Sequence, residues 1–183
     1  MKHLEILLFT KGNNTTKYLF VFLFLMLSFY VKGQVKVGDS IPQFELFTHK
    51  SKWFDSKDIK NEKGVVFFFF KGKPSKKNTI LKMYQKKYPL FLDLNVKVIG
   101  IGEDVIEDLN SLYNAEKLPF DLLSDSRGLA LELFGMDQKK LKKGNLGFTF
   151  VVKKGKIVYI ANIKENIENQ VYSALGKFID TNN

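Results

Sequence analysis

The chain has 183 residues, of which 45% are hydrophobic, so it can fill the core of one domain and is not wholly disordered. Its 29 Lys and Arg residues exceed its 19 Asp and Glu residues, which gives a net charge of +10. The chain has no cysteine and two histidines. Disulfides, thiolate metal sites and thiol chemistry are therefore excluded, and we expect no metal site and no cofactor.

The first 33 residues have the pattern of a secretory signal peptide. Lysines precede an apolar run of 14 residues at 18–31, and Val31-Lys32-Gly33 forms a weak cleavage pattern. The run is shorter than the ~20 residues that span a bilayer. We expect a cleaved signal (residues 1–33), export to the periplasm or cell envelope, and one mature domain at residues 34–183 with a net charge of +7. An uncleaved N-terminal anchor and a buried core helix are the alternatives.

The mature chain begins with a strand pair and a strongly apolar strand. Polar and apolar residues alternate at 43–46, which predicts a short strand with residues 53–54 as its hairpin partner. Asp55 is expected to cap a brief helical turn through Ile59. The run GVVFFFF at 64–70 predicts a strand that is buried on both faces.

Helices and strands alternate along the rest of the chain. A helix with apolar residues at four-residue spacing begins near Ser75 or Asn78 and should end or kink at Pro89. The further elements are a strand at 96–102, a helix at 104–116, a short strand at 121–125, a helix at 127–134, a hairpin at 147–163 and a helix at 165–179. This order predicts an α/β, thioredoxin-like fold with a central mainly parallel sheet, a C-terminal β-hairpin and helices on both faces.

Five segments, in this order, resemble motifs of the peroxiredoxins, the alkyl hydroperoxide reductase and thiol-specific antioxidant family. They are VKVGDSIPQFELF (35–47), GVVFFFF (64–70), VKVIGIGED (96–104), LPFDLLSDSRGLALELFGM (118–136) and GFTFVVKKGKIVYI (147–160). The resemblance covers residues 35–161 and implies the fold of that family. Thioredoxin-like reductases of bacterial envelopes share much of this pattern, but they usually carry a proline before the position of Thr149, where this chain has none.

The resemblance places the family's catalytic positions on residues without that chemistry. Its Pro-x-x-x-Thr/Ser-x-x-Cys loop falls on Lys71 (proline), Ser75 (Thr/Ser) and Asn78 (peroxidatic cysteine), with Thr79 next. The family's arginine falls on Gly147, and the resolving cysteine of some relatives falls on Met83. Because peroxide reduction needs a thiolate, which an amide cannot replace, we expect no thiol peroxidase activity. Asn78 then serves as a helix N-cap, and Ser75 is a loop hydroxyl or, alternatively, a contact for an oxygen-rich ligand.

Lysines cluster around these positions. Residues 71–87 contain seven lysines and residues 139–143 contain four, and in the resembled fold both segments border the former active site. A bound anion would offset the repulsion between lysines and the positive end of the helix dipole. The candidate anion-binding residues are Lys71, Lys73, Lys76, Lys77, Lys140 and Lys143. A solvated lysine surface that keeps a basic protein soluble is the alternative.

The remaining candidates favour structural roles. The acidic pairs at 103–104 and 107–108 are typical of a helix start and its solvated face, His49 is typical of a turn, and Asp125 of a turn or helix cap. Aromatic residues among the lysines fit core packing better than nucleic-acid binding. We therefore favour a non-catalytic binding or accessory module of unknown partner, with a polyanion-binding envelope protein as the alternative. A homodimer is consistent with the resembled family, and no constellation supports an enzyme of non-thiol type.

Overall fold

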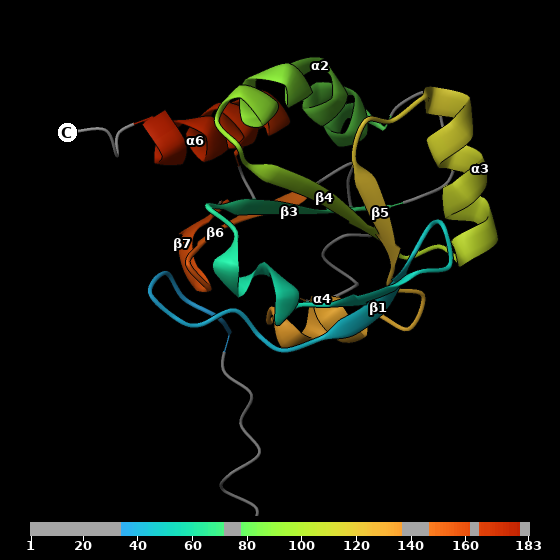
Figure 1. Cartoon of the computed structure of the whole chain (residues 1–183), viewed down its shortest axis with the longest axis horizontal. Helices are drawn as coiled ribbons and strands as arrows, with labels where there is room; N and C mark the ends of the chain where they lie inside the picture. Colours follow the sequence, from blue (N-terminus) through green and yellow to red (C-terminus); the bar gives the residue numbers. More distant parts are fainter. Residues whose placement is uncertain (1–33, 72–77, 137–146, 162–164, 180–183) are drawn as a thin grey trace, which may run out of the picture. The chain divides into compact units, whose positions relative to one another are not determined.

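The computed structural model describes residues 34–71, 78–136, 147–161 and 165–179. These residues form a seven-stranded sheet in the order β2-β1-β5-β4-β3-β6-β7, seen edge-on in Figure 1. The strands are β1 (Glu45–Thr48), β2 (Trp53–Asp55), β3 (Val65–Phe70), β4 (Lys97–Gly102), β5 (Asp121–Ser124), β6 (Phe148–Lys153) and β7 (Lys156–Ile160). Within the described ranges, no helix has both the length and the apolar character needed to cross a membrane.

Parallel pairing is confined to the centre of the sheet. β3 pairs with β4 and β4 pairs with β5 in parallel, whereas the hairpins β1–β2 and β6–β7 join β5 and β3 antiparallel. The predicted thioredoxin-like α/β fold with a C-terminal hairpin is confirmed. The expectation of a mainly parallel sheet holds for the three central strands alone. A hairpin necessarily contributes one antiparallel pair, and here both hairpins also run against their neighbours in the sheet.

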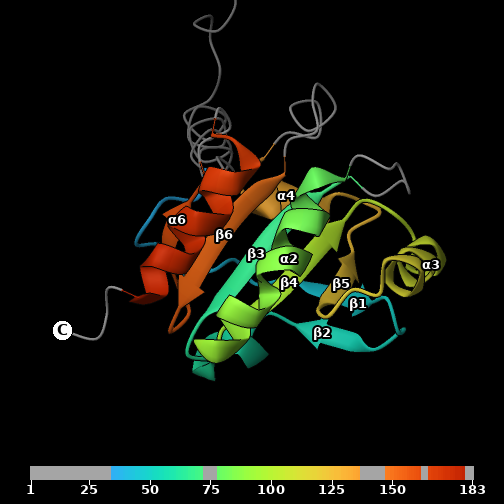
Figure 2. The same ribbon diagram turned by 90° about the horizontal axis from the view of Figure 1, so that it is seen from above.

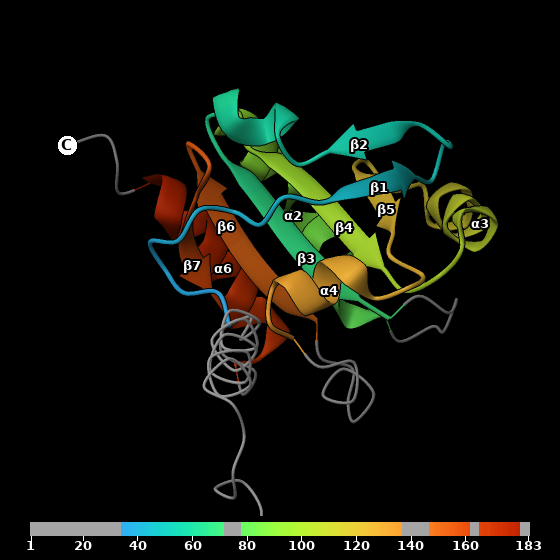
Figure 3. The same ribbon diagram turned by 90° about the horizontal axis from the view of Figure 1, so that it is seen from below.

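Helices cover both faces of the sheet, as predicted. One face carries α2 (Thr79–Asp93), α3 (Ile106–Glu116) and α6 (Ile167–Ile179). Figure 2 shows α2 and α6 side by side across the strands, with α3 near β5. The other face carries the short helix α4 (Leu129–Leu133), the 3-10 turn η2 (Asp58–Asn61) and the chain entering β1, as Figure 3 shows.

The central strand β3 supplies both hydrophobic cores at once. Successive side chains of a strand point to opposite faces, so Val65, Phe67 and Phe69 enter the core under α4. The intervening residues of the strand enter the core under α2 and α6. All six side chains of β3 are buried, as its unbroken apolar run predicts.

Pro89 does not end α2, which continues through it to Asp93. Pro89 lies on the exposed side of the helix, while Phe91, two residues later, is fully buried. The centroid of the Phe91 ring lies 5.8 Å from that of Tyr84. The packing of Phe91 therefore stabilises the last turn of the helix and offsets the hydrogen bond that is lost at the proline.

Asp55 makes a turn, but it does not begin the 3-10 helix directly. Its Oδ1 accepts a hydrogen bond from the backbone N–H of Lys57 at 2.8 Å. The helical turn then runs over Asp58–Asn61, later than predicted, because an aspartate that bonds two residues ahead forms its own turn first.

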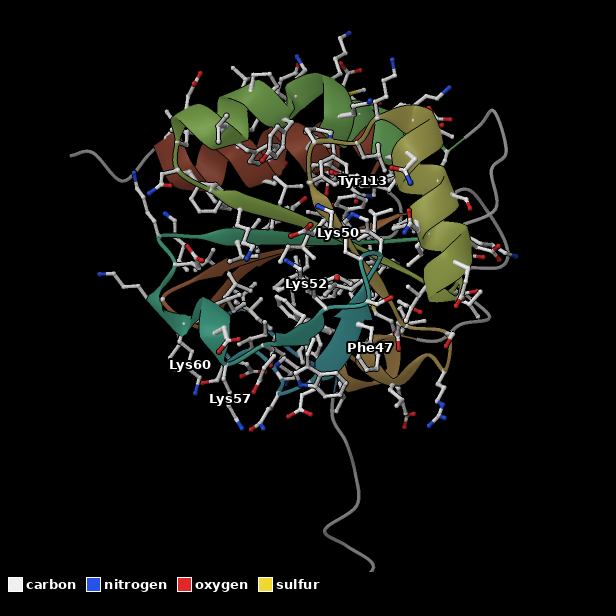
Figure 4. All side chains as sticks on the ribbon, turned by 45° about the vertical axis from the view of Figure 1, so that its right-hand side comes forward. Phe47, Lys50, Lys52, Lys57, Lys60 and Tyr113 are labelled. Atoms are coloured by element: carbon white, nitrogen blue, oxygen red, sulfur yellow. The ribbon has the colours of Figure 1, made fainter. Side chains whose placement is uncertain are left out.

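His49 lies in the turn after β1, as predicted, but its side chain is only 1% exposed. Its Nδ1 accepts a hydrogen bond from the backbone N–H of Leu122 at 3.2 Å, and its ring stacks on Tyr113 with centroids 3.9 Å apart. The Lys50 ammonium lies over the Tyr113 ring, as Figure 4 shows. Burial lowers the pKa of His49, so the neutral imidazole joins β1 to β5.

Protonation of His49 should weaken the fold. A lowered pKa means that the unfolded chain binds more protons, so the free energy of unfolding falls as the pH drops below about 6.5. We expect His49→Asn, which keeps an acceptor and cannot be protonated, to lose less stability than the wild type between about pH 7.5 and about pH 5. Urea unfolding at both pH values measures this difference. Equal losses in the two proteins would contradict the assignment.

Candidate functional site

The three parallel strands end side by side, which aligns the loops that follow them. Phe70 pairs with Gly102, and Gly102 pairs with Ser124. β6 begins at the same edge, because Phe69 pairs with Phe148. The carboxyl edge of parallel strands is where α/β proteins usually bind ligands. The sequence-predicted positions Lys71, Asn78 and Gly147 all adjoin this edge.

Asn78 occupies the residue before α2 and closes the loop that follows β3. Its side-chain nitrogen donates a hydrogen bond to the backbone oxygen of Lys71 at 3.1 Å. Asn78 is the N-cap residue of α2, as predicted, but its side chain makes no hydrogen bond to the first turn of the helix. A cap needs an acceptor aimed at the helix N–H groups, whereas this amide acts as a donor to a carbonyl beyond the end of the strand. The structure thus brings Lys71 and Asn78 together in a structural contact.

Gly147 lies against the first turn of α2, where Ile80 takes the space of a side chain. A Cβ atom built on Gly147 would overlap Cδ1 of Ile80 and lie 2.9 Å from its Cβ. Ile80 itself is only 2% exposed. A larger side chain at position 147 therefore requires Ile80 to move. The apolar side chain of Ile80 thus fills the space between Gly147 and the start of α2.

A chain of neutral hydrogen bonds lies one helical turn further into the core. Tyr84 Oη lies 2.9 Å from Thr149 Oγ1, and Thr149 Oγ1 donates to Gln170 Oε1 at 3.1 Å. The hydroxyl of Tyr84 therefore donates to Thr149 in this arrangement. The Tyr84 side chain is fully buried, and burial raises its pKa. This tyrosine remains a neutral phenol that ties α2, β6 and α6 together and is not a nucleophile.

Most of the predicted anion-binding residues lie outside the described residues. These are Ser75 of the loop and the lysines Lys73, Lys76, Lys77, Lys140 and Lys143. Lys71 and Thr79 are described and exposed, and Met83, at the position of a resolving cysteine, is half-buried in the core under α2. Whether the two lysine segments face one pocket therefore stays a prediction.

Sequence reasoning missed a cleft of about 440 Å³ at the same edge, between the β1–β2 hairpin, the start of α3 and the loop before α4. Its walls include Phe47 and Trp53, whose rings lie 4.6 Å apart and are both exposed. Figure 4 shows Phe47 on β1. Arg127, the only arginine of the chain, lines the cleft from the loop after β5. The signal available in the sequence was an aromatic residue at the outward position of an alternating strand.

Asp125 lies at the floor of this cleft and acts as a helix cap, as predicted. Its two carboxylate oxygens accept the backbone N–H groups of Ala130 at 3.1 Å and Leu131 at 2.9 Å. Burial raises the pKa of Asp125, these N–H bonds lower it, and the nearby Glu103 raises it further. Among the described residues, no group of three or more His, Asp or Glu side chains could hold a metal ion.

Replacement of Gly147 with alanine should destabilise the fold by about 1–3 kcal/mol, because the added methyl group overpacks the space that Ile80 fills. The control is Gly176→Ala in α6, where a Cβ meets nothing within 4 Å and stability should hold or rise. In an Ile80→Ala background, Gly147→Ala should lower the free energy of unfolding by less. Urea unfolding of the wild type, the two single variants and the double variant measures this coupling. An equal loss of stability in both backgrounds would contradict the conclusion that Ile80 fills the space beside Gly147.

Comparison with known proteins connects this geometry to a family. The AhpC/TSA family model matches residues 37–160. The chain is 23% identical over 148 residues to a putative peroxiredoxin bcp of Coxiella burnetii, covering 78% of this chain and 98% of that protein.

Solved structures share the fold at low identity. Peroxidoxin BcpB from Mycobacterium tuberculosis superimposes with a TM-score of 0.72 at 18% identity, over 82% of this chain and all of that one (100%). A mutant PrxQ from Xylella fastidiosa superimposes with a TM-score of 0.66 at 19% identity, over 79% of this chain and 96% of that one. The family match spans well over half of the chain, so this protein belongs to the AhpC/TSA family of peroxiredoxin-like proteins.

Proposed function

We propose that this protein is an exported redoxin-domain protein that has lost peroxidase chemistry and serves as a binding or accessory module. The observation that carries the proposal is the lack of cysteine in all 183 residues, in a chain of a thiol peroxidase family. Peroxide reduction proceeds through a thiolate that becomes a sulfenic acid, and no other side chain completes that cycle.

The geometry around the former catalytic positions supports this proposal. At the aligned cysteine position, the side-chain amide of Asn78 donates a hydrogen bond to the Lys71 carbonyl. At the aligned arginine position, Gly147 offers no charge, and Ile80 fills the adjoining space. Both the nucleophile and the cation that would stabilise developing charge are therefore replaced by structural contacts.

A binding role is supported by the cleft at the carboxyl edge of the sheet. The cleft of about 440 Å³ falls in the size range of small-molecule sites, and it combines exposed aromatic rings with the charge of Arg127. Its floor is fixed by the Asp125 hydrogen bonds, so the cleft is formed in advance of any ligand.

The full chain should not consume peroxide. With hydrogen peroxide and dithiothreitol, we expect the same consumption as with the heat-denatured protein, because the protein itself supplies no thiolate. Turnover well above that control would overturn the proposal.

A companion pair of variants tests the alignment of the site. A thiol introduced as Asn78→Cys lies at the start of α2, where the helix N-terminus lowers its pKa, so it should react with peroxide faster than the thiol of Ser111→Cys in the middle of exposed α3. Equal rates would show that position 78 does not correspond to the peroxidatic position.

Export is the second part of the proposal and is supported by the lysine-flanked apolar run at 18–31. When the full chain is produced in a bacterial host, we expect the intact mass of the envelope fraction to correspond to a chain that begins near Gln34. Deletion of residues 18–31 should retain the protein in the cytoplasm. Full-length protein that stays soluble in the cytoplasm would contradict export.

A further inference from the structure

A second cleft lies at the opposite end of the sheet from the degenerate peroxidase site. β6 begins beside Gly147 and ends at Lys153, a rise of roughly 17 Å. The turn that follows β6, residues 154–156, forms one wall of a cleft of about 340 Å³. Residues 40–43 and 56–60 form the other walls. The cleft therefore joins three segments that are far apart in the sequence.

Four lysines line this cleft: Lys57 and Lys60 from the η2 region, and Lys154 and Lys156 from the β6–β7 turn. Figure 4 shows Lys57 and Lys60 projecting outward from this turn of helix. The stem of Lys60 packs over the turn, since its Cγ would lie 3.5 Å from a Cβ built on Gly155. The fold thus holds cationic side chains from both elements around one space.

Backbone hydrogen bonds fix the walls. The N–H of Ile41 donates to Gly155 at 2.9 Å, and the N–H of Ile157 donates to Asp39 at 2.9 Å. Ser56, which is buried, accepts the N–H of Phe44 at 2.9 Å and donates to Pro42 at 3.3 Å. Because both walls are tied to the same entering segment, the cleft needs no ordering of backbone to receive a ligand.

The charge of the cleft is not neutralised within the described residues. No Asp or Glu side chain from the described segments lines it. Lys57 forms a long ion pair with Asp55 at 3.8 Å, whereas no described carboxylate pairs with Lys60, Lys154 or Lys156. Because lysines from two separate segments line one cleft, an anion that enters it is attracted by several positive charges at once.

We infer that this cleft binds a small oligophosphate, either free or as part of a larger phosphate ester. Three ammonium groups that pair with no described carboxylate exceed the charge of a single phosphate, which is about −2, and match a chain of two or three phosphates. The volume of about 340 Å³ lies at the lower end of the range for small-molecule sites. Lysines supply compact point charges and rotatable donors that suit clustered phosphate oxygens.

This site is independent of the proposed loss of peroxidase chemistry, because it uses none of the residues at the carboxyl edge. It also differs from the lysine segments at 71–87 and 139–143. Peroxide inertness and oligophosphate binding can therefore fail separately.

Isothermal titration of the full chain with tripolyphosphate tests the site. We expect saturable binding at one site and roughly tenfold or greater loss of affinity in Lys60→Gln/Lys154→Gln. The matched control, Lys52→Gln/Lys117→Gln, removes the same charge from exposed lysines outside the cleft and should bind like the wild type. Both pairs lie at the surface, and equal melting temperatures verify that the variants are folded.

Further probes decide the ligand class. Pyrophosphate should bind more weakly than tripolyphosphate, and citrate, whose charge is close to that of pyrophosphate but which carries no phosphate, should bind weakest. An amide shift of Gly155 on addition of tripolyphosphate, with none at Gly147, would place the ligand in this cleft. Absence of binding, equal loss in both double variants, or citrate binding as tightly as tripolyphosphate would each overturn the inference.

Discussion

The burial of β3 on both faces is the constraint on which the rest of the structure depends. Six consecutive apolar side chains must be covered from two sides, so helices pack on one face and α4 with the entering chain packs on the other. Parallel pairing with β4 and antiparallel pairing with β6 fix where each neighbouring strand ends. Both clefts follow from these ends, since one lies beyond the carboxyl edge of the parallel strands and the other beside the turn after β6.

At the carboxyl edge, structural contacts occupy the positions that the resemblance aligns with the family's catalytic residues. Ile80 beside Gly147 removes space, and the Asn78–Lys71 hydrogen bond closes the loop. The buried Tyr84–Thr149–Gln170 chain satisfies polar groups that would otherwise be costly in the interior. Each contact stabilises the fold, and none supplies a nucleophile. Under the proposed loss of peroxidase chemistry, packing contacts of this kind are what hold the family scaffold together.

The lysines of this basic protein differ in their surroundings, which the net charge alone does not reveal. Lys50 is engaged with Tyr113 and Asp121, and Lys87 lies over Tyr172, so these charges are partly used in local contacts. Lysines of the β6–β7 turn and the η2 region instead line one cleft, and among the described residues Lys57 alone of them pairs with a carboxylate, that of Asp55. The proposed oligophosphate binding therefore depends on the arrangement of these lysines rather than on the number of lysines in the chain.

The sequence by itself determined the fold class, the order of the elements and the missing thiol, because these depend on apolar periodicity, turn residues and composition. It also identified Asp125 as a cap, since that role is local. Only the tertiary structure decided that α2 continues past Pro89, that Asn78 bonds to Lys71, and that Lys60 and Lys154, about ninety residues apart, line one cleft. These outcomes depend on contacts between segments distant in the chain, whose pairing is set by strand register and packing and leaves no periodic signal in the sequence.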